Sequence, residues 1–107
     1  MVDVNIHKCF PTIIYEFDYE PIDKHLMETY ITQVRKNHKY HTDDDLHMLS
    51  YFARLRDMVK EVSKKYLDDL EYEYEDLEIT GMWANKLFEG DSHPPHTHSN
   101  NVLSGVY

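Results

Sequence analysis

The chain has 107 residues, of which 41% are hydrophobic and 29% are charged. This balance predicts one small globular domain over residues 1–107 rather than a disordered segment. Only 11 Lys and Arg stand against 20 Asp and Glu, a formal net charge of −9 that disfavours nucleic acid and anionic membranes as partners.

Cys9 is the only cysteine of the chain. A single cysteine excludes an internal disulfide and a zinc site built on cysteines, and it fits a reducing compartment. We expect Cys9 to be a small buried apolar residue. No apolar run approaches the roughly 20 residues that a membrane-spanning helix needs.

The first half of the chain predicts an extended segment and then two helices. Val2–Phe17 is rich in the β-branched and aromatic residues typical of strands. Pro21 suits a first helical turn, and apolar residues then recur at helical spacing up to Asn37. A polar connection follows over His38–Asp45. The next helix carries an apolar stripe that predicts packing against a sheet: Leu49, Phe52, Leu55, Val59, Val62, Tyr66 and Leu70.

From Leu77 onwards the apolar pattern has a period of two, which predicts a strand over Leu77–Trp83. Gly90 and Asp91 indicate a turn, and Val102–Tyr107 reads as a second strand. The predicted order is strand, helix, helix, strand, loop, strand. Because the sequence stops within an apolar run, we expect further polypeptide or a second copy of the chain to cover the open sheet edge.

Three of the eight histidines, His93, His96 and His98, lie within six residues. In an extended segment residues i and i+2 point the same way, so His96 and His98 can converge on one metal ion. His93 needs a bend across Pro94 and Pro95 to join them. The motif alone does not choose among zinc, iron, nickel and copper, and a loop with merely polar histidines is the alternative interpretation.

The residues around this motif resemble a known family. The matching runs are Met82-Trp83-Ala84-Asn85, Gly90, His96-Thr97-His98 and Leu103-Ser104-Gly105-Val106-Tyr107. Together they are similar to a family of 2-oxoglutarate/Fe(II)-dependent oxygenases of marine bacteria and their phages. Phe10-Pro11-Thr12 resembles the opening motif of that family. The resemblance is strong over Ile79–Tyr107, whereas over the two helices only the layout agrees.

This resemblance implies an α+β fold, a partial double-stranded β-helix (jelly roll) with two helices packed on the sheet. The implied reaction is hydroxylation of a C–H bond coupled to oxidative decarboxylation of 2-oxoglutarate. His96 would bind Fe(II), and His98 stands at the position where the family usually has Asp or Glu. The iron site then either uses three histidines, or His98 lies behind the ligands and another group binds the ion. Asn85 and Tyr107 would border the 2-oxoglutarate pocket.

The resemblance also predicts that this chain is the N-terminal part of a larger oxygenase domain. The distal His and the Arg that such enzymes need lie beyond the family's Ser-Gly-Val-Tyr strand, so we expect no turnover from this chain alone. The implied location is the cytoplasm of a bacterial or phage-infected host cell. The substrate is not readable from the sequence.

Two alternatives stay open. One is a non-catalytic binding or structural module on the same jelly-roll scaffold, with a vestigial histidine metal site. The other is a small metal-binding protein of the cupin type, which would hold a metal without 2-oxoglutarate.

Overall fold

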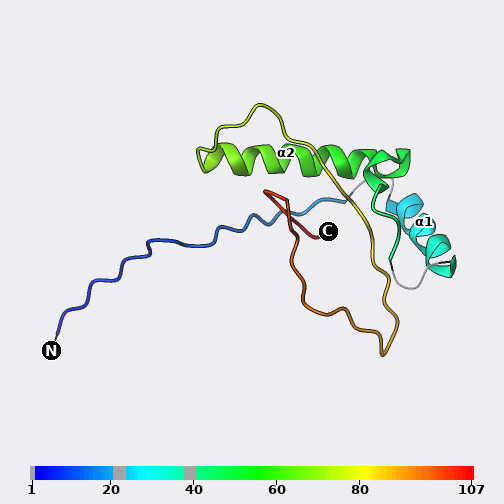
Figure 1. Cartoon of the computed structure of the whole chain (residues 1–107), viewed down its shortest axis with the longest axis horizontal. Helices are drawn as coiled ribbons and strands as arrows, with labels where there is room; N and C mark the ends of the chain where they lie inside the picture. Colours follow the sequence, from blue (N-terminus) through cyan, green and yellow to red (C-terminus); the bar gives the residue numbers. More distant parts are fainter. Residues whose placement is uncertain (1, 21–23, 38–40) are drawn as a thin grey trace.

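The computed structural model describes residues 2–20, 24–37 and 41–107. Its helices are α1 (Lys24–Asn37), two single 3-10 turns, η1 (Leu46–Met48) and η2 (Ser50–Phe52), and α2 (Ala53–Asp69). Figure 1 shows α1 beside the first turns of α2, an N-terminal arm leading away from both, and a long loop that follows α2. None of the helices in these three stretches is long and apolar enough to cross a membrane.

The two predicted helices are confirmed. The first ends at Asn37 as predicted, while the predicted start at Pro21 lies outside the described residues. The second begins later than its apolar stripe. Leu49 and Phe52 lie in and between the 3-10 turns, whose backbone bonds, such as Leu49 N–H to Leu46 O at 3.0 Å, lead stepwise into α2.

The C-terminal end of α2 is set by its backbone. Glu71 has a left-handed φ of 61°, its N–H donates to Asp68 O at 3.0 Å, and the N–H of Tyr72 donates to Leu67 O at 3.0 Å. This pair of bonds is the Schellman motif, which satisfies the last carbonyls of a helix and usually has Gly at the left-handed position. The motif ends α2 and reverses the chain toward residues 77–107.

A small core gathers where α1, the 3-10 turns and the start of α2 meet. Four buried side chains form it: Met27, Leu46, Phe52 and Leu55. Leu46 and Phe52 are 1% and 2% exposed. Partly buried residues pack around them: Tyr19, Tyr30, Ile31, Leu49, Val59, Met82 and Ala84. The core therefore holds the segment around residues 82–84 against the helices.

That segment pairs with the connection before η1, but only briefly. His41 forms an isolated antiparallel bridge with Asn85, and Asp45 forms an isolated parallel bridge with Met82. The bonds include Thr42 N–H to Ala84 O at 2.9 Å and Met82 N–H to Asp44 O at 2.9 Å. The pairing stops where η1 begins, because the 3-10 turn takes the chain out of the extended conformation.

The jelly-roll prediction is wrong, and so is the α+β assignment. Within residues 2–20, 24–37 and 41–107 there is no sheet, and the predicted strands Val2–Phe17, Leu77–Trp83 and Val102–Tyr107 do not pair with one another. Alternating apolar residues show only that a segment suits an extended conformation. A strand also needs a neighbour whose N–H and C=O groups are in register. The helices consequently pack on each other and on residues 82–84 instead of on a sheet.

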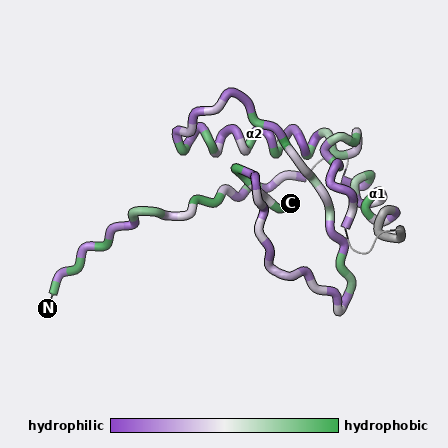
Figure 2. Tube along the Cα trace, in the orientation of Figure 1, coloured by the Kyte–Doolittle hydropathy of each residue, from purple (hydrophilic) through white to green (hydrophobic). Residues whose placement is uncertain are grey.

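The N-terminal arm is tied to the second half of α2. The Tyr15 hydroxyl donates to the Asp69 carboxylate, and the Tyr66 hydroxyl donates to Ile13 O at 2.8 Å. The rings of Tyr15 and Tyr66 meet edge to face with centroids 4.8 Å apart. Before this tether the arm is exposed, and Figure 2 shows hydrophilic and hydrophobic residues alternating along it. The predicted burial of Cys9 is wrong, since Cys9 lies in this exposed part.

Candidate functional site

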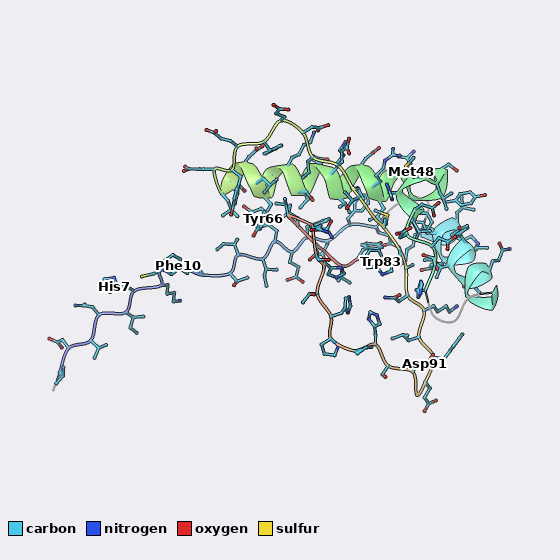
Figure 3. All side chains as sticks on the ribbon, in the orientation of Figure 1. His7, Phe10, Met48, Tyr66, Trp83 and Asp91 are labelled. Atoms are coloured by element: carbon cyan, nitrogen blue, oxygen red, sulfur yellow. The ribbon has the colours of Figure 1, made fainter. Side chains whose placement is uncertain are left out.

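The candidate metal ligands lie on the loop that follows α2 and extends away from the helices. The loop turns at Phe88–Asp91, where the N–H of Asp91 donates to Phe88 O at 2.9 Å and the Asp91 carboxylate accepts from Phe88 N–H at 2.9 Å. Gly90 has a φ of 87°, which only Gly adopts freely. This confirms the predicted turn. Figure 3 shows Asp91 at the far end of the loop, away from the helices.

Beyond the turn, the imidazole rings of His93, His96 and His98 follow one another along the loop. The rings of His96 and His98 have centroids 4.8 Å apart, and those of His93 and His96 are 4.6 Å apart. A metal bound to a ring nitrogen at about 2.0–2.1 Å lies roughly 3.2 Å from the ring centre, so two ligand rings at about 90–110° stand about 4.5–5.2 Å apart. Both centroid distances fall in this range, and both pairs meet edge to face, with 73° between the planes of His96 and His98 and 63° between those of His93 and His96. The bend across the two prolines also brings His93 next to His96.

A hydrogen bond to the backbone sets the orientation and the tautomer of the His96 ring. Its Nδ1 lies 3.1 Å from Pro94 O. A carbonyl oxygen can only accept, so Nδ1 carries the proton and, in the neutral ring, Nε2 keeps its lone pair. Metal-binding histidines commonly use this arrangement, in which a backbone carbonyl holds one ring nitrogen and the other binds the ion. Pro94 thus supplies the hydrogen-bond acceptor for His96 and also restricts the backbone before it.

The three histidines are exposed, and they do not form a complete set of metal ligands. Over the described parts of the chain, no group of three or more His, Cys, Asp or Glu side chains is placed to hold a metal ion. The structure thus brings the rings of His96 and His98 together without a third ligand beside them among the described residues.

Two contacts at the base of the loop were not foreseen from the sequence. The ring of Trp83 lies 5.6 Å from that of His98, centroid to centroid, with 39° between the planes. The Thr80 hydroxyl donates to Asn101 Oδ1 at 2.9 Å. Trp83 is 41% exposed, so part of its side chain is covered and part is open to solvent. No spacing rule relates residues this far apart in the sequence, which is why neither contact was predicted.

The residues expected to border a 2-oxoglutarate pocket are placed differently. Asn85 is exposed and takes part in the bridge with His41. Tyr107, which is 62% exposed, lines a shallow depression at the base of the N-terminal arm together with Asp18, Tyr19, Glu20 and Lys24. That depression is distinct from the surroundings of Asn85.

The chemistry of the depression does not fit a dicarboxylate. Asp18 and Glu20 would repel 2-oxoglutarate by charge. Lys24 is the cation there, and its ammonium lies 3.3 Å from the Glu20 carboxylate, whose hydrogen bond raises the pKa of Lys24. The residues around Tyr107 are consequently a poor match for the cosubstrate.

Comparisons of this chain with protein-family models, with curated proteins and with solved structures found no match. The resemblance to the oxygenase family therefore rests on the sequence motifs alone.

Proposed function

We propose that this chain binds a divalent transition metal through His96 and His98, as part of an iron-dependent oxygenase of the 2-oxoglutarate type. The observation that carries the metal proposal is the ring pair itself: 4.8 Å between centroids, with Nδ1 of His96 held by Pro94 O. The oxygenase assignment is supported by the motifs around Trp83, Gly90 and the Ser104–Tyr107 run. When bound, Fe(II) would supply the oxygen-activating chemistry.

The chain's own residues have defined parts in this proposal. Nε2 of His96 would bind the ion, while the Pro94 carbonyl holds the ring and its tautomer. The ring of His98 supplies the second nitrogen. Two neutral imidazoles leave the ion's charge uncompensated, where the common two-His, one-carboxylate set would neutralise part of it. We therefore expect weaker Fe(II) binding than in a carboxylate-containing site.

The test is a metal titration followed by the fluorescence of Trp83, the only tryptophan. Because its ring lies 5.6 Å from that of His98, a paramagnetic ion such as Ni(II) or Co(II) bound there should quench the emission. We expect saturable quenching in the wild-type chain and its loss in the variants His96→Ala and His98→Ala. The variant His25→Ala is the matched control, because it removes an exposed imidazole on α1. Unchanged quenching in the first two variants would refute the proposal.

The oxygenase part is tested separately, through binding of the cosubstrate 2-oxoglutarate. We expect no turnover from this chain alone. We expect 2-oxoglutarate to strengthen metal binding only if the cosubstrate also contacts the ion, so Ni(II) titrations with and without it decide whether a cosubstrate site exists.

A second candidate function is a non-catalytic metal-binding module. It is favoured by one observation, the acidic surroundings of Tyr107, which suit a dicarboxylate poorly. Under this alternative the metal titration shows saturable binding, and added 2-oxoglutarate does not change the metal affinity.

Under either function, the single, exposed Cys9 fits a reducing compartment, and we propose that the protein is cytoplasmic.

A further inference from the structure

Two side-chain contacts join the two ends of the histidine loop at its base. Trp83 contacts His98, and Thr80 contacts Asn101. Moving three residues back from Trp83 reaches Thr80, and moving three residues forward from His98 reaches Asn101. The two segments run in opposite directions between these contacts, and Ser99 and Asn100 form a turn in which Asn100 has a φ of 60°. We call residues 80–83 and 98–101 together the neck of the loop.

One side of the neck is anchored to the core. Met82 and Ala84 pack against the core cluster, and their backbones bond to the connection before η1: Met82 N–H to Asp44 O at 2.9 Å, and Ala84 N–H to Thr42 Oγ1 at 3.0 Å. In an extended segment successive side chains point to opposite faces. With Met82 and Ala84 turned toward the core, Trp83 is directed to the other face, where His98 lies.

We propose that Trp83 is a positioning residue for the metal pair, and that it acts through His98. The inference rests on the proposed metal function. The indole lies against the imidazole of His98 and restricts its rotation, which lowers the entropy cost of binding an ion. An aromatic ring within about 6 Å of a positive charge also attracts that charge, and a metal-bound imidazole shares the charge of its ion. Trp83 thus favours a cationic ligand, a divalent transition metal, on the loop.

The test compares Ni(II) affinity in Trp83 variants by isothermal titration calorimetry. We expect Trp83→Leu to weaken binding about two- to five-fold, the range of an exposed cation–aromatic contact, and Trp83→Phe to retain most of the affinity. A Trp83→Phe variant that loses as much affinity as Trp83→Leu would overturn the proposal, as would unchanged affinity in Trp83→Leu.

Asn101→Ala gives a second variant that leaves the indole in place. It removes the acceptor of the Thr80 hydroxyl at an exposed position, so the helical circular dichroism should be unchanged while Ni(II) affinity falls. Unchanged affinity would contradict the role of the neck. Melting curves of every variant, recorded without metal, identify any that fail to fold.

A measurement on the metal-free protein separates this inference from the proposed function. A nuclear Overhauser effect between the Trp83 indole and the His98 ring is expected in the absence of any metal. If that effect is seen and no metal binds, the metal function fails and the neck stands. If it is absent, the inference about Trp83 is wrong even if His96 and His98 bind metal.

Discussion

The left-handed residue that ends α2 offers a stabilising substitution, Glu71→Gly. A residue other than Gly in this conformation costs about 1–2 kcal/mol. Gly removes that cost. Its greater conformational freedom in the unfolded chain, however, lowers the free energy of unfolding by about 0.5–1 kcal/mol. The net expectation is a rise of about 0.5–1 kcal/mol in the free energy of unfolding, measured by urea denaturation followed by circular dichroism.

The control for this prediction is Glu71→Ala. It removes the same carboxylate from the negative end of the α2 dipole, yet it keeps a Cβ at a φ of 61°. We expect Glu71→Ala to change stability by a few tenths of a kcal/mol at most, which separates the charge from the backbone conformation. A Glu71→Gly variant that is less stable than wild type, or no more stable than Glu71→Ala, would refute the reasoning.

Two further predictions concern the core and the arm. Phe52→Ala leaves a cavity between α1 and α2 and should lower the free energy of unfolding by about 3–5 kcal/mol, which urea denaturation would show; a loss below 1 kcal/mol would mean that Phe52 is not at the centre of a packed core. The hydrogen bond from Tyr15, with a smaller contribution from Lys65, lowers the pKa of Asp69. Because the pKa is lower in the folded chain, this contact stabilises the arm above the unfolded-state pKa, and the stabilisation is lost as the pH falls through the folded-state pKa. An NMR titration of the Asp69 carboxyl should show the lowered pKa and its upward movement in Tyr15→Phe; an identical pKa in both chains would argue against the tether.

The helices were predictable because their signal is local. Apolar residues at steps of three and four define a face, and Phe52 and Leu55 on that face are buried as a helical stripe requires. The apolar stripe predicted the buried residues less well toward the C-terminal end of α2. Leu67 is 3% exposed there, although the pattern favoured Tyr66 and Leu70. Tyr66 instead turns its ring to Tyr15 of the arm, a contact 51 residues away that no local pattern contains.

The predicted sheet was wrong because strand pairing is not a local property of the sequence. Leu77–Trp83 has the alternation of a strand, yet Met82 and Ala84 bond to an irregular segment that soon enters η1. The turn at Gly90 was predictable, because its positive φ follows from the residue type. The closeness of His96 and His98 was also predictable from their spacing, whereas the position of Trp83 beside His98 depends on how the core holds residues 82–84.

The most direct test of the metal proposal is an NMR titration of the imidazole nitrogens with Zn(II), in a chain labelled with ¹⁵N at histidine. The proposal predicts that the Nε2 signal of His96 moves to the range of a metal-bound nitrogen while its Nδ1 stays protonated, and that a ring nitrogen of His98 shifts at the same Zn(II) concentration. Zinc that leaves both rings unchanged, or that shifts His25 as strongly as His96, would contradict it.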